Sequence, residues 1–300
     1  PGRGTIMRSN LVVGDCIEVM SAMPNGSADL VFADPPFNIG YKYDRYDDRR
    51  PRAVYLRFAA RWMRGAARLL SDSGSLFVAI NDAWAAEYRD LGLHLGLTLR
   101  NWIIWHYTFG PHQKRKFGRD HAHILYFTAH PKRFTFNADA VRVESARQRM
   151  GDKRANPAGR VPGDVWQFPR LPGNAKERTG HPCQMPEAIL ERIILAASNP
   201  GDLVFDPFAG SGTTLAVAKR LGRRWAGCEL SPDYAAKIEE RLAKIESPLD
   251  PPEQETTCLE SPDSPTSLSR SLASFSSTRG NSGPTGLKAS ARTRRRAAGR

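Results

Sequence analysis

The sequence predicts an α/β protein with a mostly parallel sheet that helices cover on both faces. Short apolar runs alternate with stretches of helical periodicity from residue 11 to residue 245. This alternation is typical of strand–helix–strand units whose parallel strands are buried on both faces. Hydrophobic residues make up 40% of the 300 residues, which suits one large core, alone or with a small accessory domain.

The apolar pattern of the first half of the chain predicts alternating strands and helices. The runs at 11–13 and 30–33 predict buried strands. Apolar residues at helical spacing predict an amphipathic helix over about 52–70, with its core face at Tyr55, Phe58, Trp62, Ala66 and Leu69. Further elements are expected as a strand at 76–80, a helix at 83–94, and aromatic, β-branched strands at 102–107 and 124–127.

The second half continues the alternation after an irregular region. Residues 108–180 are rich in Arg, Lys, Gly and Pro, and an insertion this long within a compact domain is usually functional or disordered. From Ser247 to Arg300 the composition turns to Ser, Pro, Thr and Arg, which predicts a disordered tail after a domain at 1–246. Between them we expect a helix at 186–198, a strand at 203–205, a helix at 212–221, a strand at 224–228 and a helix at 232–245.

Charge and cysteine usage limit the class of protein. A formal charge of +13 and a pI near 9.9 favour a polyanionic partner. No apolar stretch approaches the length of a membrane span, and the N-terminus lacks the apolar core of a signal peptide. The four cysteines are scattered without metal spacing, so we expect reduced thiols in a cytoplasmic protein, at Cys16, Cys183, Cys228 and Cys258.

The turn Asp34-Pro35-Pro36-Phe37 ends an apolar run. The Asp34 carboxylate and a proline carbonyl can accept both hydrogens of an amino group, and the ring of Phe37 can stack on a flat base. The two prolines stiffen the turn, because each fixes its own φ and restricts the preceding residue. Taken alone, the same letters also fit a strand that ends in a Pro-rich turn.

A second motif combines a strand, a glycine turn and a helix start over 204–214. Thr213 and Thr214 stand where a phosphate-binding loop requires Lys and Ser or Thr, and the third glycine of a dinucleotide fingerprint is missing. Glu229 ends the next strand, where a carboxylate can bind two ribose hydroxyls. The pattern suits a nucleoside cofactor without a pyrophosphate; the alternative is a plain strand–helix–strand unit with a solvated Glu229.

Together and in this order, the motifs resemble the β-class DNA amino-methyltransferases, specifically the adenine-N6 group related to the RsrI and MboII modification enzymes. The Asp34 turn matches the catalytic DPP[YFW] motif and precedes the S-adenosylmethionine glycine motif, as in that family. Val13-Gly14-Asp15-Cys16 resembles the family's GD-C turn. The segment His181 to Pro186 resembles HPTQKP, with Cys183 and Met185 in place of Thr and Lys. The resemblance covers about residues 7–245.

The resemblance implies a class I S-adenosylmethionine-dependent methyltransferase fold. Its features would be a doubly wound, seven-stranded, mostly parallel sheet, a circularly permuted motif order and a DNA-recognition insertion at about 108–180. The implied reaction is site-specific methyl transfer to adenine N6 in double-stranded DNA by base flipping. The catalytic residues would be Asp34, Pro35, Pro36 and Phe37. The cofactor would contact Asp15, Cys16, Asp34, His181, Asp206, Phe208, Gly210, Ser211, Gly212, Thr213, Thr214 and Glu229.

Basic residues of the irregular region are the expected DNA contacts, with a solvated charged face as the alternative. They are Lys114, Arg115, Lys116, Arg119, Arg147, Lys153 and Arg154. His121 and His123 favour a structural role over a metal site, and this type of methyl transfer needs no metal. Partners beside DNA would be a second copy and a cognate restriction endonuclease, in a prokaryotic or phage-encoded enzyme. Cytosine-N4 methylation and an inactive DNA-binding relative are the alternative functions.

Overall fold

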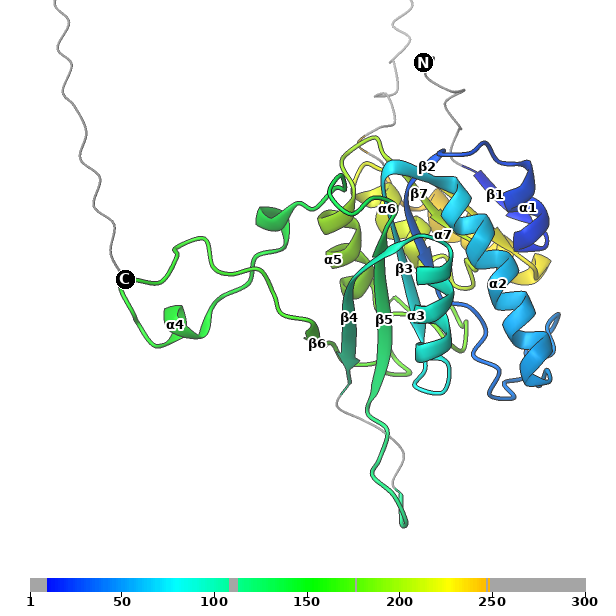
Figure 1. Cartoon of the computed structure of the whole chain (residues 1–300), viewed down its shortest axis with the longest axis horizontal. Helices are drawn as coiled ribbons and strands as arrows, with labels where there is room; N and C mark the ends of the chain where they lie inside the picture. The colour runs from blue at the N-terminus through cyan, green and yellow to red at the C-terminus, as the bar shows by residue number, and fades with distance from the viewer. Residues whose placement is uncertain (1–9, 108–112, 176, 247, 249–300) are drawn as a thin grey trace, which may run out of the picture. The chain divides into compact units, whose positions relative to one another are not determined.

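The computed structural model describes residues 10–107, 113–175, 177–246 and 248. In this part of the chain, eight strands form a single sheet (Figure 1). Their order across the sheet is β1 (Asn10–Val13), β8 (Arg224–Glu229), β7 (Leu203–Asp206), β2 (Ala28–Ala33), β3 (Leu70–Ile80), β5 (His121–Thr128), β4 (Thr98–His106) and β6 (Val165–Gln167).

The sheet is mostly parallel. Strand β5 is the exception, because it pairs antiparallel with both β3 and β4. The chain first builds outward from β2 toward β3 and later returns on the other side through β7 and β8. The direction in which successive strands are added to the sheet therefore reverses between β2 and β7. In open α/β sheets, ligands bind beyond the carboxyl ends of the strands at such a reversal.

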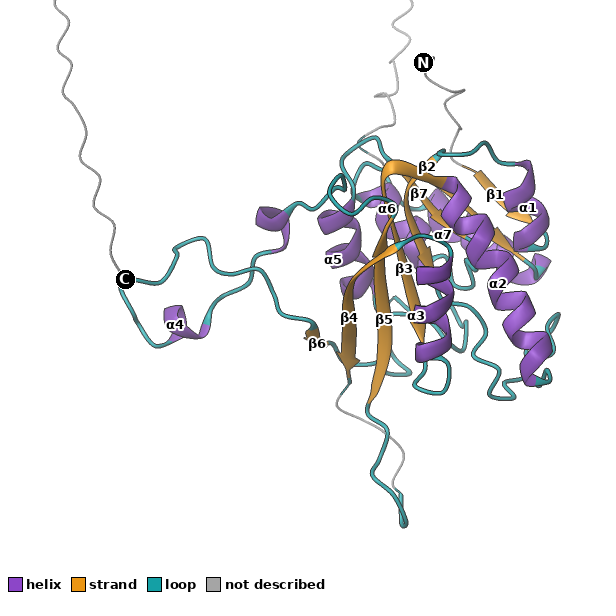
Figure 2. Cartoon of the chain, in the orientation of Figure 1, coloured by secondary structure: helices purple, strands orange, loops and turns teal. Residues whose placement is uncertain are grey.

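Helices cover both faces of the sheet (Figure 2). One core lies under α1 (Cys16–Ala22), α2 (Arg52–Leu69) and α3 (Ala85–His94). The opposite core lies under α5 (Glu187–Ala197) and α6 (Thr213–Arg220). Helix α7 (Pro232–Ala243) packs on α6 and on the outer strands β1 and β8. The predicted α/β architecture with two covered faces is confirmed.

Helix α2 confirms the amphipathic helix expected over 52–70. Its buried side chains recur with the period of a helix, so they form one stripe against the sheet. They are Tyr55, Ala59, Trp62, Met63, Ala66 and Leu69. The helix starts at the carboxyl edge of the sheet, directly after the loop that follows the catalytic turn.

Two strands differ from the sequence prediction. Strand β1 is not buried, because it lies at the sheet edge with β8 as its neighbour; Val12 and Val13 are 36% and 52% exposed. The sheet also has an eighth strand, β6, where seven strands were expected. Its three residues pair with the far side of β4 and bury only Trp166, which is too short a pattern to stand out in the sequence.

In the described part of the region expected to be an insertion, the loops are interrupted by β5 and β6, which belong to the central sheet. After β5 the chain forms the short helices η1 (Ala138–Val141) and α4 (Ala146–Arg149), and a bridge joins Val143 to Arg160. The predicted disordered tail lies outside the described residues, apart from Pro248. No helix in the described ranges is long and apolar enough to cross a membrane.

Candidate active site

A cavity of about 950 Å³ lies beyond the carboxyl ends of the parallel strands. Its volume is at the upper end of the usual range for small-molecule sites. Residues that follow β1, β2, β7 and β8 all contribute to its wall, so both sequence motifs open into one space. The predicted residues that line it are Asp15, Cys16, Asp34, Pro35, Pro36, Phe37, Arg119, His181, Asp206, Phe208, Gly210, Ser211, Thr213, Thr214 and Glu229.

The turn Asp34 to Phe37, predicted to be catalytic, keeps two hydrogen-bond acceptors free. The Pro36 carbonyl accepts a hydrogen bond from Tyr55 Oη at 2.8 Å, and the Phe37 carbonyl accepts one from Trp84 Nε1 at 2.8 Å. Within the described residues, neither the Asp34 carboxylate nor the Pro35 carbonyl has a hydrogen-bond partner. The protein thus occupies the two later carbonyls and leaves a neighbouring carboxylate and carbonyl available to a ligand.

A buried aspartate fixes the loop that follows the turn. Asp48, 1% exposed, accepts backbone N–H groups from Asn38, Ile39 and Tyr41 at 2.7, 3.0 and 2.9 Å. Asn38 adopts a left-handed conformation with φ of 53°, and its side chain exchanges two hydrogen bonds with the backbone of Arg50. These bonds hold the turn rigid from its far side.

Three carboxylates meet at the strand ends. Burial, together with the charge of Asp206, raises the pKa of Asp34 to about 8. Asp34 lies deep in the protein, although its surface remains accessible from within the cavity. Burial raises the pKa of Asp206 to about 7, against the hydrogen bond from Phe208 N at 2.9 Å. Burial also raises the pKa of Glu229. A positively charged ligand beside these acids would favour their ionised forms and lower their pKa values.

Glu229 anchors the glycine turn. Its two carboxylate oxygens accept the N–H groups of Gly210 and Ser231, at 2.7 and 2.9 Å. Each oxygen retains a second lone pair, so the carboxylate can still accept hydroxyl groups. Gly210 has φ of 53°, and a Cβ there would lie 3.2 Å from the ring of His181. The close approach of these segments therefore requires glycine.

Gly212 does not line the cavity, although its position in the motif predicted contact with the cofactor. It precedes α6 with φ of 71°, and a Cβ would lie 2.7 Å from Ile238. Its missing side chain instead allows α6 to pack closely against α7. The sequence motif alone does not separate these two uses of a glycine.

His181 lines the cavity, and one of its ring nitrogens has no hydrogen-bond partner among the described residues. The residue is 9% exposed, its ring centroid lies 4.7 Å from that of Tyr234, and its Nδ1 is buried without a partner. Burial lowers its pKa to about 4, so the ring is neutral near pH 7. A buried nitrogen without a partner costs free energy unless a ligand or water satisfies it.

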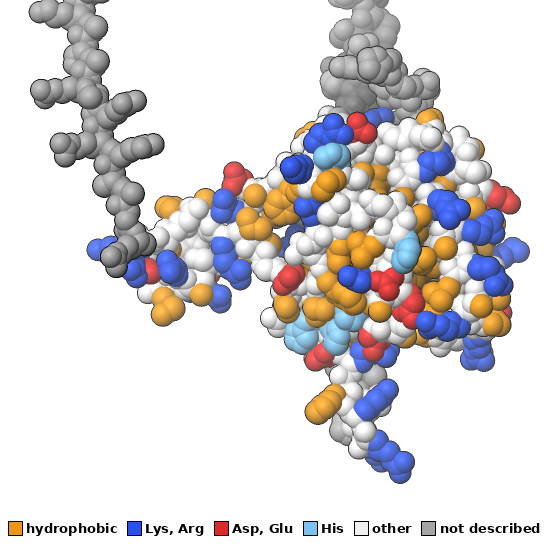
Figure 3. Space-filling view, viewed as in Figure 1, with side chains coloured by type: hydrophobic (Ala, Val, Ile, Leu, Met, Phe, Trp, Pro, Cys, Tyr) orange, Lys and Arg blue, Asp and Glu red, His pale blue; other side chains and the backbone are white. Residues whose placement is uncertain are grey.

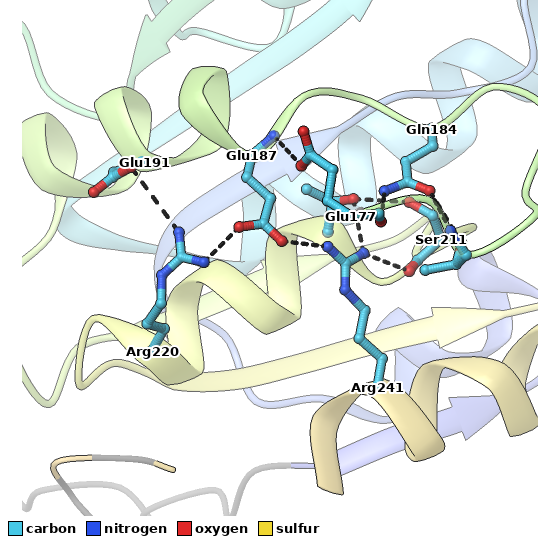
Figure 4. Close-up of polar contacts among 9 residues, drawn as sticks. Glu177, Gln184, Glu187, Glu191, Ser211, Arg220 and Arg241 are labelled. Carbon is cyan, nitrogen blue, oxygen red and sulfur yellow. Dashed lines mark hydrogen bonds and ion pairs between the residues drawn. The ribbon is translucent and has the colours of Figure 1, made fainter. Parts of the chain in front are cut away.

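A polar network ties the His181 segment to the glycine turn (Figure 4). Arg241 of α7 donates to the Ser211 carbonyl at 3.0 Å, to Thr213 Oγ1 at 3.1 Å and to Glu187 at 2.6 Å. Glu187 also donates its backbone N–H to Glu177 Oε2 at 3.1 Å. Gln184 donates to the Glu177 carbonyl at 2.6 Å and accepts the Thr179 N–H at 2.8 Å. The two segments that meet at the cavity are thus fixed by common partners.

Cys183 and Met185, the two departures from the family motif, both line the cavity. Met185 is 7% exposed and packs in the core under α5, so an apolar side chain fits that position. Cys183 lines the cavity, where burial and the charge of Asp34 raise the pKa of its thiol.

The predicted DNA contacts separate into groups. Arg119 lines the cavity and pairs with Asp82 at 2.8 Å. Arg154 pairs with Asp152 at 3.0 Å. The others are exposed, on the loop before β5, on α4 and on the segment after it: Lys114, Arg115, Lys116, Arg147 and Lys153.

Sequence reasoning missed several residues of the cavity wall. Asn81 directly follows β3, and its amide oxygen and nitrogen are both buried without a partner. A polar residue at the end of a buried strand was the signal that could have identified it. Tyr43 and Tyr46 lie in the loop after the catalytic turn, where the close spacing of aromatic residues was a similar signal.

Comparisons with known proteins agree with this geometry. The type II methyltransferase M.HpaI of Haemophilus parainfluenzae is 37% identical over 237 residues, which cover 79% of this chain and 74% of that protein. The DNA adenine methyltransferase YhdJ of Escherichia coli K12 is 37% identical over 233 residues, covering 75% of this chain and 79% of that protein.

Solved structures share the fold. The cytosine-N4-specific PvuII DNA methyltransferase aligns with a TM-score of 0.64 over 79% of this chain and 87% of its own, and its 19% identity speaks for the fold alone. A DNA modification methylase of Thermus thermophilus, complexed with S-adenosyl-L-methionine, aligns with a TM-score of 0.55 and 28% identity over 78% of this chain and 93% of its own. The family model for N6/N4 DNA methylases matches residues 28–240, and the chain therefore belongs to that family.

Proposed function

We propose that the chain methylates the N6 amino group of adenine at a specific site in double-stranded DNA, with S-adenosylmethionine as methyl donor. The observation that carries the proposal is the pair of free acceptors, the Asp34 carboxylate and the Pro35 carbonyl, beside a cavity that suits a cationic nucleoside. YhdJ and M.HpaI, whose names describe DNA methylation, support it.

The cavity wall fits the cofactor in charge and in shape. When bound, S-adenosylmethionine supplies an electrophilic methyl group on a positively charged sulfonium. Asp206 and Glu229 provide negative charge on the side of the glycine turn, and Gly210 leaves room for close approach. Glu229 is placed to accept ribose hydroxyls, and His181 Nδ1 offers a buried polar atom that needs a partner.

Asp34 and Pro35 act on the target amine. Accepting both N6 hydrogens orients the nitrogen lone pair toward the methyl group and stabilises the positive charge that develops on nitrogen. With its raised pKa, the Asp34 carboxylate is also a competent acceptor for the proton that N6 releases. Phe37 lies next to these acceptors, where its ring can stack on the base flipped out of the duplex.

The modified nucleoside is the decisive measurement. DNA methylated by the purified protein is digested to nucleosides and analysed by mass spectrometry, and we expect N6-methyladenine. N4-methylcytosine instead would contradict the adenine assignment. Asp34→Ala should still bind the cofactor and should lose at least about a hundredfold in turnover. Near-normal turnover in that variant would contradict the role of Asp34.

Target recognition and partners are further proposals. We infer that the segments at 113–120 and 129–164 contact the DNA target, because they carry exposed basic side chains at or beyond the cavity edge.

The protein would act as a homodimer, paired with a cognate endonuclease or as an orphan enzyme. Light scattering of the purified protein tests the homodimer, and resistance of DNA from expressing cells to restriction enzymes tests the protective role.

A further inference from the structure

Helix α2 carries five arginines and no acidic residue among its 18 residues. The arginines at its two ends have partners in the protein. Arg52 pairs with Glu87 at 2.7 Å, and Arg68 donates to backbone carbonyls of α1 and the turn after it. The three arginines between them make no side-chain hydrogen bond or ion pair with any described residue: Arg57, Arg61 and Arg64.

These three side chains form one exposed row, here called the arginine face. Positions four and three residues apart lie on the same side of a helix, so Arg57, Arg61 and Arg64 follow one another along its surface. Lys and Arg side chains are seen along the side of the molecule where α2 runs (Figure 3). Like charges at this spacing destabilise a helix, and no acid on α2 offsets them. An external anion would remove this repulsion.

The arginine face begins at the active site. Arg57 and Arg61 line the cavity that holds Asp34, whereas Arg64 lies outside its wall. The first turns of α2 also support the catalytic turn through the hydrogen bond from Tyr55 to the Pro36 carbonyl. A ligand that follows the row therefore extends from the cavity along the outer surface of α2.

The length of the row indicates a polymer. From residue 57 to residue 64 a helix rises roughly 10 Å, which is about the rise of three base pairs along one DNA strand. A single carboxylate or phosphate requires one or two arginines and would not use Arg64, which the cavity does not reach. Arginine forks bind phosphate oxygens well because their donors match the phosphate geometry.

We propose that the arginine face binds phosphates of the DNA substrate beside the base that enters the cavity. The proposal rests on DNA being the substrate, but it does not depend on which base is methylated. It adds a contact surface on α2, remote in sequence from the basic residues between 113 and 160. Contacts to phosphates position the duplex and carry no base specificity.

The test measures DNA binding against salt concentration. Affinity of the full-length protein for a fluorescent random-sequence duplex is measured by anisotropy across a KCl series. The variant R57Q/R61Q/R64Q should bind about 10- to 100-fold more weakly near 0.1 M salt. Its slope of log Kd against log salt should fall by about 2 to 3, because each lost phosphate contact removes about 0.9. Glutamine keeps good helix propensity, so the helix is retained.

A second triple variant controls for net charge. R89Q/R220Q/K244Q removes the same charge from exposed positions on α3, at the end of α6 and directly after α7, away from the cavity wall and from the segments proposed to contact DNA. It should change DNA affinity less than about threefold, as expected for charges outside the contact. Thermal unfolding and cofactor affinity of both variants establish that fold and cofactor site are intact.

Each outcome decides the proposal. An R57Q/R61Q/R64Q variant with the same salt slope as the wild type, or as the control, overturns it. Weaker cofactor binding with unchanged DNA binding also overturns it and assigns the arginines to the cofactor. Because the assay detects binding without methylation, an inactive enzyme or a different target base does not affect the result.

Discussion

At the scale of single residues, Asp34 combines two properties that normally oppose each other. It is deeply buried, which favours the neutral acid, yet its chemistry requires the carboxylate form. Positive charge in the same cavity would stabilise the carboxylate form, first from the cofactor and then from the target nitrogen. The pKa values of about 8 for Asp34 and about 7 for Asp206 place the conflict near neutral pH.

Cofactor affinity should therefore depend on pH according to charge. Below pH 7 Asp34 and Asp206 are largely protonated, and above pH 8 they are largely ionised, so the cavity gains negative charge as the pH rises. We expect the Kd of S-adenosylmethionine to tighten by about tenfold or more from pH 6 to pH 9, since one pKa unit of coupling corresponds to tenfold. Isothermal calorimetry measures this directly.

S-adenosylhomocysteine is the matched control ligand, because it lacks the sulfonium charge and keeps the rest of the cofactor. Its Kd should change much less over the same range. If both ligands tighten equally, the pH effect does not come from the sulfonium charge, and the electrostatic account of the site is wrong.

The sequence identified the turn Asp34 to Phe37 as a candidate site but did not predict the groups that support it. Asp34 and Pro35 were identifiable because the motif is local. The donors to the next two carbonyls, Tyr55 and Trp84, lie on distant parts of the chain. Periodicity assigned Tyr55 only to a buried helix face, since a hydrophobic stripe does not reveal which hydroxyl finds a carbonyl.

At the scale of elements, the site depends on how helices hold the turns between them. The glycine turn is fixed from two sides, by Glu229 at the end of β8 and by Arg241 on α7. Arg241 is also bound to Glu187, the first residue of α5. The position of the turn therefore depends on α5 and α7, neither of which carries a motif.

Arg241→Met should weaken cofactor binding while leaving DNA binding largely intact. The change removes donors from the Ser211 carbonyl and Thr213 Oγ1, and hydrogen bonds to charged groups contribute about 1.5–3 kcal/mol. We expect the KM for S-adenosylmethionine to rise about tenfold and the KM for DNA to change less than about twofold.

Arg220→Met provides the control, because Arg220 also binds Glu187 but makes no bond to the glycine turn. It should leave the KM for the cofactor near the wild-type value. Equal effects of the two variants would mean that Glu187 matters only for stability and that Arg241 does not position the turn.

Strands show where an apolar pattern is sufficient and where it is not. The runs at β2, β3 and β7 were assigned correctly because burial on both faces gives a continuous apolar stretch. The run at β1 is similarly apolar, yet this strand lies at an edge of the sheet. The prediction failed there because an apolar pattern contains no information about which strands are neighbours.

At the scale of the whole molecule, the buried acids affect the stability of the fold. The pKa of Asp34 is raised in the folded protein above its ordinary value of 3.8. The folded state therefore holds this proton more tightly than the unfolded chain. Its contribution to stability is fully present below about pH 4 and is lost as pH rises through about 8.

Asp34→Asn should therefore stabilise the protein most at alkaline pH. The variant cannot acquire the buried charge, so its free energy of unfolding should exceed that of the wild type at pH 9, on the order of 2–5 kcal/mol. The difference should shrink toward pH 5. Denaturant unfolding across this range measures it, with the exposed Glu240→Gln as control. A difference that does not vary with pH would contradict the raised pKa.

The segment between β5 and β6 has a further consequence. Its two ends are held by strands that pair with opposite sides of β4, so the distance between its ends is set by the sheet. Doubling the length of a flexible loop with fixed ends costs only about 0.6 kcal/mol. The first part of the segment packs on α5, where Asn137 is hydrogen-bonded to Ala196, Leu195 and Ser198. The part beyond the bridge between Val143 and Arg160 has both of its ends fixed by that bridge. We therefore expect that residues 144–159 can be exchanged as a unit while the Asp34 turn and the glycine turn keep their places.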